Sequence, residues 1–293
     1  METALINDFL DHSSPDFVSK SSSHPVQSIL DVVYGNQIFF RSFGKANEES
    51  IIFLPGLYES CSSSIFLLDL LESYGYCCYS IELNEYKTIK RMIKGFLQFC
   101  ARENIKKCHL IGSDYGGFQI LQIASYEKLK NEVEIKSIIL INSFVSVNNF
   151  AKLSLKTNIF GKLGIKSLLY DEIKNIRKVN EDKNMIKTFD FITKEIDFLD
   201  SENVYCKLIQ RASKTLPINL HFSYERIMTI ETLDNSFNIP DAILPSNYFS
   251  KCKVAFMKYG GNWPHVSNAF DTLNYVFVHL KNFGYIPKLN EMI

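Results

Sequence analysis

The stretch CHLIGSDYGGFQILQIA, residues 108–124, limits the possible folds of this 293-residue chain more than any other feature. Its first half has the pattern of a buried strand that ends at Gly112, and Gly116 begins a helical pattern after a tight turn. Small residues two positions before and two after Asp114 permit the strained backbone of a nucleophile elbow, a strand–turn–helix junction that exposes the side chain at its apex. The stretch therefore predicts an elbow with Asp114 at its apex.

Apolar segments of strand length and of helix length alternate along most of the chain. The patterns predict strands at 37–43, 51–54, 76–83, 107–112, 135–142, 226–233 and 253–259, and helices at 62–74, 88–103, 117–129 and 265–282. Repeated strand–helix units of this length form a doubly wound, mostly parallel sheet with right-handed crossovers. Together with the elbow, this order predicts an α/β-hydrolase fold.

Two segments depart from the alternation. Residues 1–28 are rich in serine and short of periodic apolar residues, so we expect a loosely ordered N-terminal arm. Residues from about 146 to about 225 are polar and helical in pattern, without a clear parallel strand. We therefore predict a core of residues 29–293, interrupted at about 146–225 by a helical cap insertion over the carboxyl edge of the sheet, where such sheets bind ligands.

The aspartate at the apex has two interpretations. Asp114 can attack carbon and form an ester intermediate, as carboxylate nucleophiles do in several hydrolases. It can also cap the following helix by accepting hydrogen bonds from backbone N–H groups. Ser113 is an alternative nucleophile, but its position one residue before the apex is expected to turn its hydroxyl away from the crevice. The turn alone does not separate these interpretations.

The other two positions of a catalytic triad also differ from those of an active serine hydrolase. The loop KYGGNWPHV after the last predicted strand carries Asn262 where the fold places its histidine, and an amide is not a usable base near neutral pH. His265, three residues further along, is the candidate substitute base. Asp234 takes the position of the acid, and without a histidine to orient we expect it to hold the loop through backbone N–H groups or through Asn262.

The stretch LPGLYES, which begins at Leu54, occupies the place of the oxyanion loop. The backbone N–H groups of Leu57 and Tyr115 are expected to converge on one anion there. This arrangement suits either a catalytic oxyanion hole or a vestigial pocket.

The composition excludes several classes of function. Lysine plus arginine (32) balances aspartate plus glutamate (32), so we expect no nucleic-acid partner. The first residues lack the features of a secretory signal, and no run of about 18 apolar residues predicts a spanning helix, so any membrane contact is expected to be peripheral. The seven cysteines are irregularly spaced and predict reduced core thiols rather than disulfides or a zinc site. We expect neither a cofactor nor a metal.

Four stretches together resemble the maspardin family of α/β-hydrolase-fold proteins. They are HLIGSDYGGF (109–118), SIILINSF (137–144), LDNS (233–236) and, above all, GGNWP (260–264). Members of that family similarly carry an asparagine after the paired glycines. One departure is at the elbow apex, where the family has serine and this chain has Asp114.

The resemblance implies a non-catalytic, protein-binding role in the cytosol and on endosomal or trans-Golgi membranes, with an aldehyde dehydrogenase among the partners. Our first hypothesis is therefore an adaptor in intracellular trafficking that binds proteins through its cap and crevice rim. The alternative is a hydrolase with an aspartate nucleophile, similar to epoxide hydrolases and haloalkane dehalogenases. Asn262 opposes the alternative because loss of the base typically costs roughly 10²- to 10⁴-fold in rate.

Overall fold

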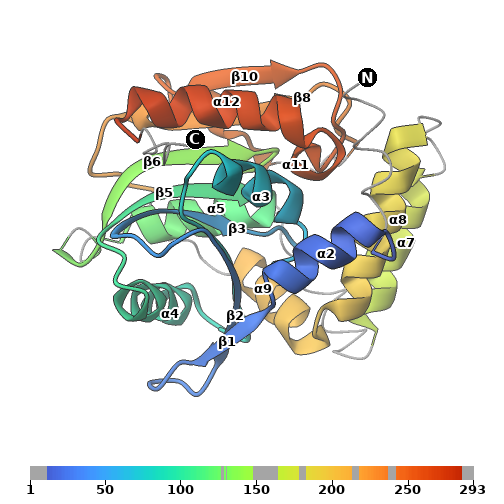
Figure 1. Cartoon of the computed structure of the whole chain (residues 1–293), viewed down its shortest axis with the longest axis horizontal. Coiled ribbons are helices and arrows are strands. Elements are labelled where there is room, and N and C mark those ends of the chain that lie inside the picture. Colours follow the sequence, from blue (N-terminus) through green and yellow to red (C-terminus); the bar gives the residue numbers. More distant parts are fainter. Residues whose placement is uncertain are drawn as a thin grey trace, which may run out of the picture.

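An eight-stranded sheet occupies the centre of the molecule (Figure 1), with the strand order β1-β2-β4-β3-β5-β6-β8-β10. The computed structural model describes residues 12–126, 129, 131–147, 164–177, 183–212, 218–236 and 242–285. The strands are β1 (Gln27–Leu30), β2 (Gln37–Phe43), β3 (Glu49–Leu54), β4 (Cys78–Leu83), β5 (Lys107–Ser113), β6 (Glu134–Ile141), β8 (Ile227–Thr232) and β10 (Lys253–Met257). Strands β4, β3, β5, β6, β8 and β10 run parallel, and β2 and β1 follow antiparallel at one edge.

The central strands are buried on both faces, which explains their continuous apolar sequences. In β3 the run Ile51 to Leu54 is fully buried, and the corresponding residues of β6 are nearly so. A strand covered by helices on both faces has no polar side to display, so its sequence does not alternate. The predicted mostly parallel sheet of an α/β-hydrolase fold is confirmed by this topology.

Two helical layers cover the sheet. Helix α3 (Ile65–Ser73) packs with α11 (Pro264–Ser267) and α12 (Ala269–Asn282), while α4 (Ile89–Arg102) packs with α5 (Tyr115–Ala124). The amphipathic pattern predicted for α4 is present, and Thr88 caps its N-terminus by accepting from the backbone N–H of Arg91. The last predicted helix is divided in two, because the backbone leaves the helical conformation at Asn268.

Three helices between β6 and β8 form the cap. They are α7 (Ile165–Arg177), α8 (Lys183–Phe198) and α9 (Ser201–Ala212), and Figure 1 shows α7 and α8 side by side at one end of the molecule. The short strands β7 (Ser146–Val147) and β9 (Ala242–Ile243) pair beside the main sheet. Two further short elements are η2 (Tyr224–Arg226) and α10 (Pro245–Tyr248).

The serine-rich arm contains a helix that its composition did not predict. Helix α2 (Pro15–Ser23) begins at the capping residue Ser14 and buries one aromatic side chain, Phe17. The Phe17 ring contacts Phe66 of α3 at 6.0 Å and Phe191 of α8 at 5.6 Å between ring centroids. Phe17 is therefore an apolar contact of this segment with both the core and the cap.

No disulfide joins any of the seven cysteines, all of which lie in the described ranges, and six of them are buried. Within the described ranges, no helix combines the length and the apolar character needed to cross a membrane.

Candidate functional site

The turn between β5 and α5 has the geometry of a nucleophile elbow. Asp114 stands at its apex with φ +46° and ψ −113°, a conformation that non-glycine residues rarely adopt. The neighbouring glycines permit this turn because a Cβ on Gly116 would lie 2.0 Å from the carbonyl oxygen of Leu54, and one on Gly112 would lie 2.6 Å from the Gly116 backbone. The close approach of β3 to the turn brings the loop after β3 against the apex.

The carboxylate of Asp114 occupies the oxyanion-like site itself. The backbone N–H of Leu57 donates to Asp114 Oδ2 at 3.3 Å, and the backbone N–H of Tyr115 also bonds to this carboxylate. Burial raises the pKa of Asp114 to about 6, although the Arg211 guanidinium and the two N–H groups oppose this increase. The backbone N–H groups of Leu57 and Tyr115, which were predicted to converge on one anion, therefore both bond to the side chain at the apex.

Asp234 holds the loop after β10. Its carboxylate accepts from the backbone N–H of Gly260 at 3.1 Å and from that of Gly261 at 2.8 Å. Gly261 has φ +57°, in the left-handed region that favours glycine. Of the two roles expected for Asp234, the structure shows the bonds to backbone N–H groups rather than a bond to Asn262.

Asn262 lies buried at the position where a catalytic histidine is expected. Its Oδ1 accepts from the backbone N–H of Ser236 at 3.2 Å, and its carbonyl accepts from Asn142 at 3.2 Å. Its Nδ2 has no hydrogen-bond partner within the described residues. The side chains of Asp114, Asp234 and Asn262 all follow carboxyl ends of parallel strands, but in the described part of the chain none of them bonds to another.

Asn142 connects the loops that carry these side chains. It follows β6 with φ +44°, and its Nδ2 donates to the carbonyl oxygens of Gly261 and Asn262. The backbone N–H of Asp114 in turn donates to the carbonyl of Ile141, the residue before Asn142. The elbow and the glycine loop thus meet at the end of β6.

His265 does not act on Asp114. Its ring is fully buried, and its Nε2 lies 3.1 Å from Oε2 of Glu59. The side chain therefore belongs to a buried pair with Glu59, and within the described residues it does not bond to Asp114.

Glu59 is a central member of the site that the sequence analysis missed. Its buried carboxylate accepts from Ser113 Oγ at 2.8 Å, from Ser63 Oγ at 3.0 Å and from the backbone N–H of Gly56, and it faces His265. Burial alone would raise the pKa of Glu59, but His265 and these donors outweigh burial and hold the pKa below its usual value. The hydroxyl of Ser113 is thereby occupied by its hydrogen bond to Glu59.

A signal for Glu59 was present in the sequence. It is the only charged residue between Ser50 and Leu68, in a stretch of apolar residues and serines. A lone acid in such a stretch is buried only with partners, so it indicates a buried polar network. Its partner His265 follows 206 residues later in the chain.

Lys207 of the cap completes this network. It is buried, and its Nζ donates to the carbonyl oxygen of Gly56 at 3.0 Å and to that of Glu59 at 3.5 Å. Burial lowers the pKa of Lys207, while the nearby Glu82, Glu59 and Asp114 carboxylates raise it. The cap is therefore attached to the oxyanion loop by a buried charge.

Within the described residues, no histidine serves as a general base for the apex carboxylate. All six histidines lie in the described part of the chain, and none of them bonds to Asp114. His109 and His279 are buried within the core, and His221 is exposed. A water molecule that attacked an ester of Asp114 would thus have no imidazole to accept its proton.

The sequence is related to maspardin over most of its length. It is 22% identical to maspardin of Danio rerio over 276 residues, which cover 92% of this chain and 87% of the relative. It is 23% identical to maspardin of Mus musculus with 92% and 88% covered, and 23% identical to maspardin of Homo sapiens with 80% and 75% covered. No protein-family model matches the chain.

Solved structures show the same fold at low sequence identity. A carboxylesterase structure from Nitrososphaera gargenis has a TM-score of 0.69 and 14% identity, covering 88% of this chain and 98% of its own. A hydrolase from Pseudomonas aeruginosa has a TM-score of 0.67 and 10% identity, with 87% and 98% covered. The enol-lactonase from Burkholderia xenovorans has a TM-score of 0.62 and 14% identity, with 88% and 100% covered. The chain therefore has the α/β-hydrolase fold.

Proposed function

We propose that this maspardin homologue is a non-catalytic adaptor that binds proteins in intracellular trafficking, in the cytoplasm and peripherally on endosomal or trans-Golgi membranes. The observation that carries the proposal is the replacement of the catalytic base: Asn262 stands in the histidine position, and Asp234 is bonded to the backbone of the glycine loop. An amide cannot shuttle a proton, so the site lacks the group that regenerates a hydrolase after each turnover.

Apolar side chains at the rim support a protein-binding role. Phe198 at the end of α8 is 72% exposed, Leu233 after β8 is 70% exposed and Tyr259 after β10 is 64% exposed. Exposed aromatic and aliphatic side chains are the residues that anchor protein interfaces. The proposed partner is a protein, and an aldehyde dehydrogenase is the candidate to be tested first because of the resemblance to maspardin.

The catalytic part of the proposal is tested by exposing the purified chain to epoxides, haloalkanes and activated esters. We expect neither turnover nor a mass increase of the intact protein. Turnover that disappears in Asp114→Ala, or an adduct mapped to Asp114 that the protein then hydrolyses, would refute a non-catalytic role.

The binding part is tested by pull-down from cytosol and by titration with an aldehyde dehydrogenase. We expect capture by the wild-type chain and loss of capture in a Leu233→Asp/Tyr259→Asp variant, because two charges would then be buried in the interface. Val278→Asp, which changes a side chain that is 62% exposed on α12, serves as the matched control. Equal capture by all three proteins would contradict a partner at the rim.

A hydrolase with an aspartate nucleophile is the second candidate, because of the elbow at Asp114. The strained apex holds the Asp114 carboxylate at the position of a nucleophile, from which a carboxylate oxygen would attack carbon. Without a base, such a site would form an ester once and retain it. A stable adduct on Asp114 without turnover would therefore favour this candidate over a site that has lost all reactivity.

A further inference from the structure

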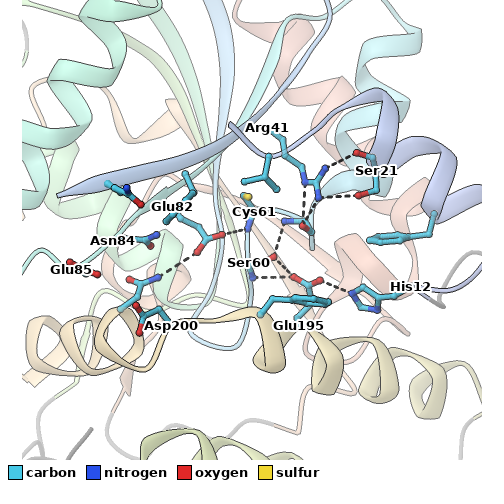
Figure 2. A pocket seen from close by; sticks show the side chains of 17 residues that line it. His12, Ser21, Arg41, Ser60, Cys61, Glu82, Asn84, Glu85, Glu195 and Asp200 are labelled. Carbon is cyan, nitrogen blue, oxygen red and sulfur yellow. Dashed lines mark hydrogen bonds and ion pairs between the residues drawn. The ribbon is translucent and has the colours of Figure 1, made fainter. Parts of the chain in front are cut away.

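A cavity of about 540 Å³ lies beside the elbow, and neither Asp114 nor Asn262 lines it. Its walls come from β2, the end of β4, the loop after β3, and the junction between α8 and α9 (Figure 2). Small-molecule sites in proteins have volumes of this size, roughly 300–1,000 Å³. The cavity is thus large enough to hold an organic ligand.

Four carboxylates line the cavity. Glu82 at the end of β4 and Glu195 of α8 are buried, and Glu85 and Asp200 line the same cavity as exposed residues. Figure 2 shows Glu82 and Glu195 pointing toward the space between the core and the cap. Glu82 Oε1 accepts from the backbone N–H of Cys61 at 2.6 Å, and Glu195 accepts from His12 and Ser60.

The one arginine of the lining does not neutralise these acids. Arg41 is buried, and its five N–H donors bond to Ser62 Oγ, to Ser21 Oγ and to the carbonyl oxygens of Ser21 and His24. All of these acceptors are neutral, and within the described residues the guanidinium has no carboxylate within salt-bridge distance. Its hydrogen-bonding capacity is used up by the protein.

Two buried amide oxygens in the lining have no partner. Asn84 is 5% exposed and Asn203 is 1% exposed, and in the described part of the chain neither Oδ1 atom accepts a hydrogen bond. Asn203 uses its amide nitrogen to donate to Glu82 Oε2 at 3.4 Å. A buried acceptor without a donor costs about 1–3 kcal/mol, so these atoms indicate a ligand that supplies donors.

We propose that this cavity binds an organic polyamine cation, whose ammonium groups donate to Glu82, Asn84 and Asn203 in the interior and to Glu85 and Asp200 at the mouth. Among the described residues, two amide oxygens of the lining lack a donor, and its four carboxylates outnumber the two nearby cations, Arg41 and Lys207, so the complementary ligand carries N–H donors and positive charge.

The apolar part of the lining suits the hydrocarbon segments of such a molecule. Phe17, Val26, Phe39 and Phe198 line the cavity, and aromatic faces also attract ammonium groups. A metal ion fits less well, because in the described ranges no three of the lining His, Cys, Asp or Glu residues place ligand atoms close enough to share one ion.

The experiment is calorimetric titration of the full chain at low salt with spermidine and, separately, with 1,8-octanediol, a neutral chain with terminal hydroxyl donors. We expect saturable binding of spermidine that weakens as salt is added, and no saturable binding of the diol. Tighter binding of the diol, or no saturable binding of spermidine by the folded chain, would overturn the proposal.

Two variants locate the binding. Glu82→Gln keeps an acceptor for the N–H of Cys61 while removing the inner charge, and is expected to weaken spermidine binding by at least about tenfold. Glu85→Gln/Asp200→Asn changes only exposed residues, so it removes the two negative charges at the mouth without disturbing the core. Asparagine at position 200 can still accept from the backbone N–H of Glu202 at the start of α9.

The double variant is expected to weaken binding several-fold, and the matched surface control Glu225→Gln to leave it unchanged. Wild-type affinity in both cavity variants, or an equal loss in Glu225→Gln, would show general attraction to an acidic surface and overturn the assignment.

Discussion

The backbone N–H of Leu57 donates to Oδ2 of Asp114 at 3.3 Å, so the apex side chain lies in the site that would stabilise an oxyanion. In a serine hydrolase the corresponding N–H groups are free to bind the oxygen of a substrate carbonyl. Here a resident carboxylate already accepts from them. A carbonyl ester would therefore have to displace a carboxylate to reach these donors.

Asp114→Asn is expected to stabilise the protein above about pH 6. The folded state raises the pKa of Asp114 from 3.8 to about 6, so ionisation of this carboxyl opposes folding. Wild-type stability consequently falls as pH rises through this interval, whereas asparagine carries no such penalty. We expect the free energy of unfolding at pH 8 to be about 1–2 kcal/mol higher for Asp114→Asn, after a reduction for the partial exposure of the side chain. Urea unfolding measures it.

The pH dependence separates this effect from a general change in packing. Below about pH 3 the wild-type carboxyl is protonated in both the folded and the unfolded state, so ionisation no longer affects the difference between the two proteins. A gain in stability for Asp114→Asn that is the same at about pH 3 and at about pH 8 would contradict the assigned cause.

Glu59→Gln is expected to destabilise the protein by about 3 kcal/mol near neutral pH, because it removes the buried carboxylate that contacts Ser63, Ser113 and His265. The pKa of Glu59 is lower in the folded state than its unfolded value of 4.5. The Glu59 carboxylate therefore stabilises the folded state fully above pH 4.5, and this stabilisation is lost as the pH falls through the lower folded pKa. The difference between the two proteins should shrink in that acidic range.

A double-mutant cycle with His265→Gln assigns this loss to the contact between Glu59 and His265. We expect a coupling of about 2 kcal/mol between Glu59→Gln and His265→Gln. Glu59→Gln should be additive with His221→Gln, which changes an exposed histidine. Additivity in the Glu59–His265 cycle would mean that their 3.1 Å contact contributes little.

Gly116→Ala is expected to cost on the order of 3 kcal/mol, because its Cβ would meet the backbone carbonyls of Leu54 and Pro55, which cannot rotate away. Gly35→Ala is the control, since no atom lies within 4 Å of its Cβ. Its positive φ of +71° should cost only about 1 kcal/mol. Thermal unfolding of both variants measures the difference, and equal losses would show that the close approach at the elbow is unimportant.

Local sequence patterns were sufficient to predict the elbow and the loops that face it. The spacing of small residues around Asp114 specifies a strained turn by steric rules alone, and the paired glycines before Asn262 mark the loop after the last strand. Likewise, the continuous apolar run of β3 indicates a strand buried on both faces. These features depend on a few neighbouring residues.

The Glu59–His265 pair could not be predicted in the same way, because its partners come from loops that adjoin only in the folded chain. The burial of polar residues in the cap could not be predicted for the same reason. In α9 the polar residues Asn203, Lys207 and Gln210 recur at helical spacing, a pattern that usually indicates a solvated face. They are buried because the groups opposite them, Glu82 and the carbonyls of the oxyanion loop, are polar as well.

Lys207→Met tests whether the cap depends on this buried charge. Methionine matches the length of lysine but leaves the carbonyl of Gly56 without its donor, and Glu59 and Glu82 lose a neighbouring cation. We expect the free energy of unfolding to fall by about 1–3 kcal/mol. Relative to the wild type, hydrogen exchange should accelerate more in α9 than in the central strands. Lys194→Met, at an exposed position of α8, should change stability by less than about 0.5 kcal/mol. Unchanged exchange in α9 after Lys207→Met would show that apolar contacts alone hold the cap on the core.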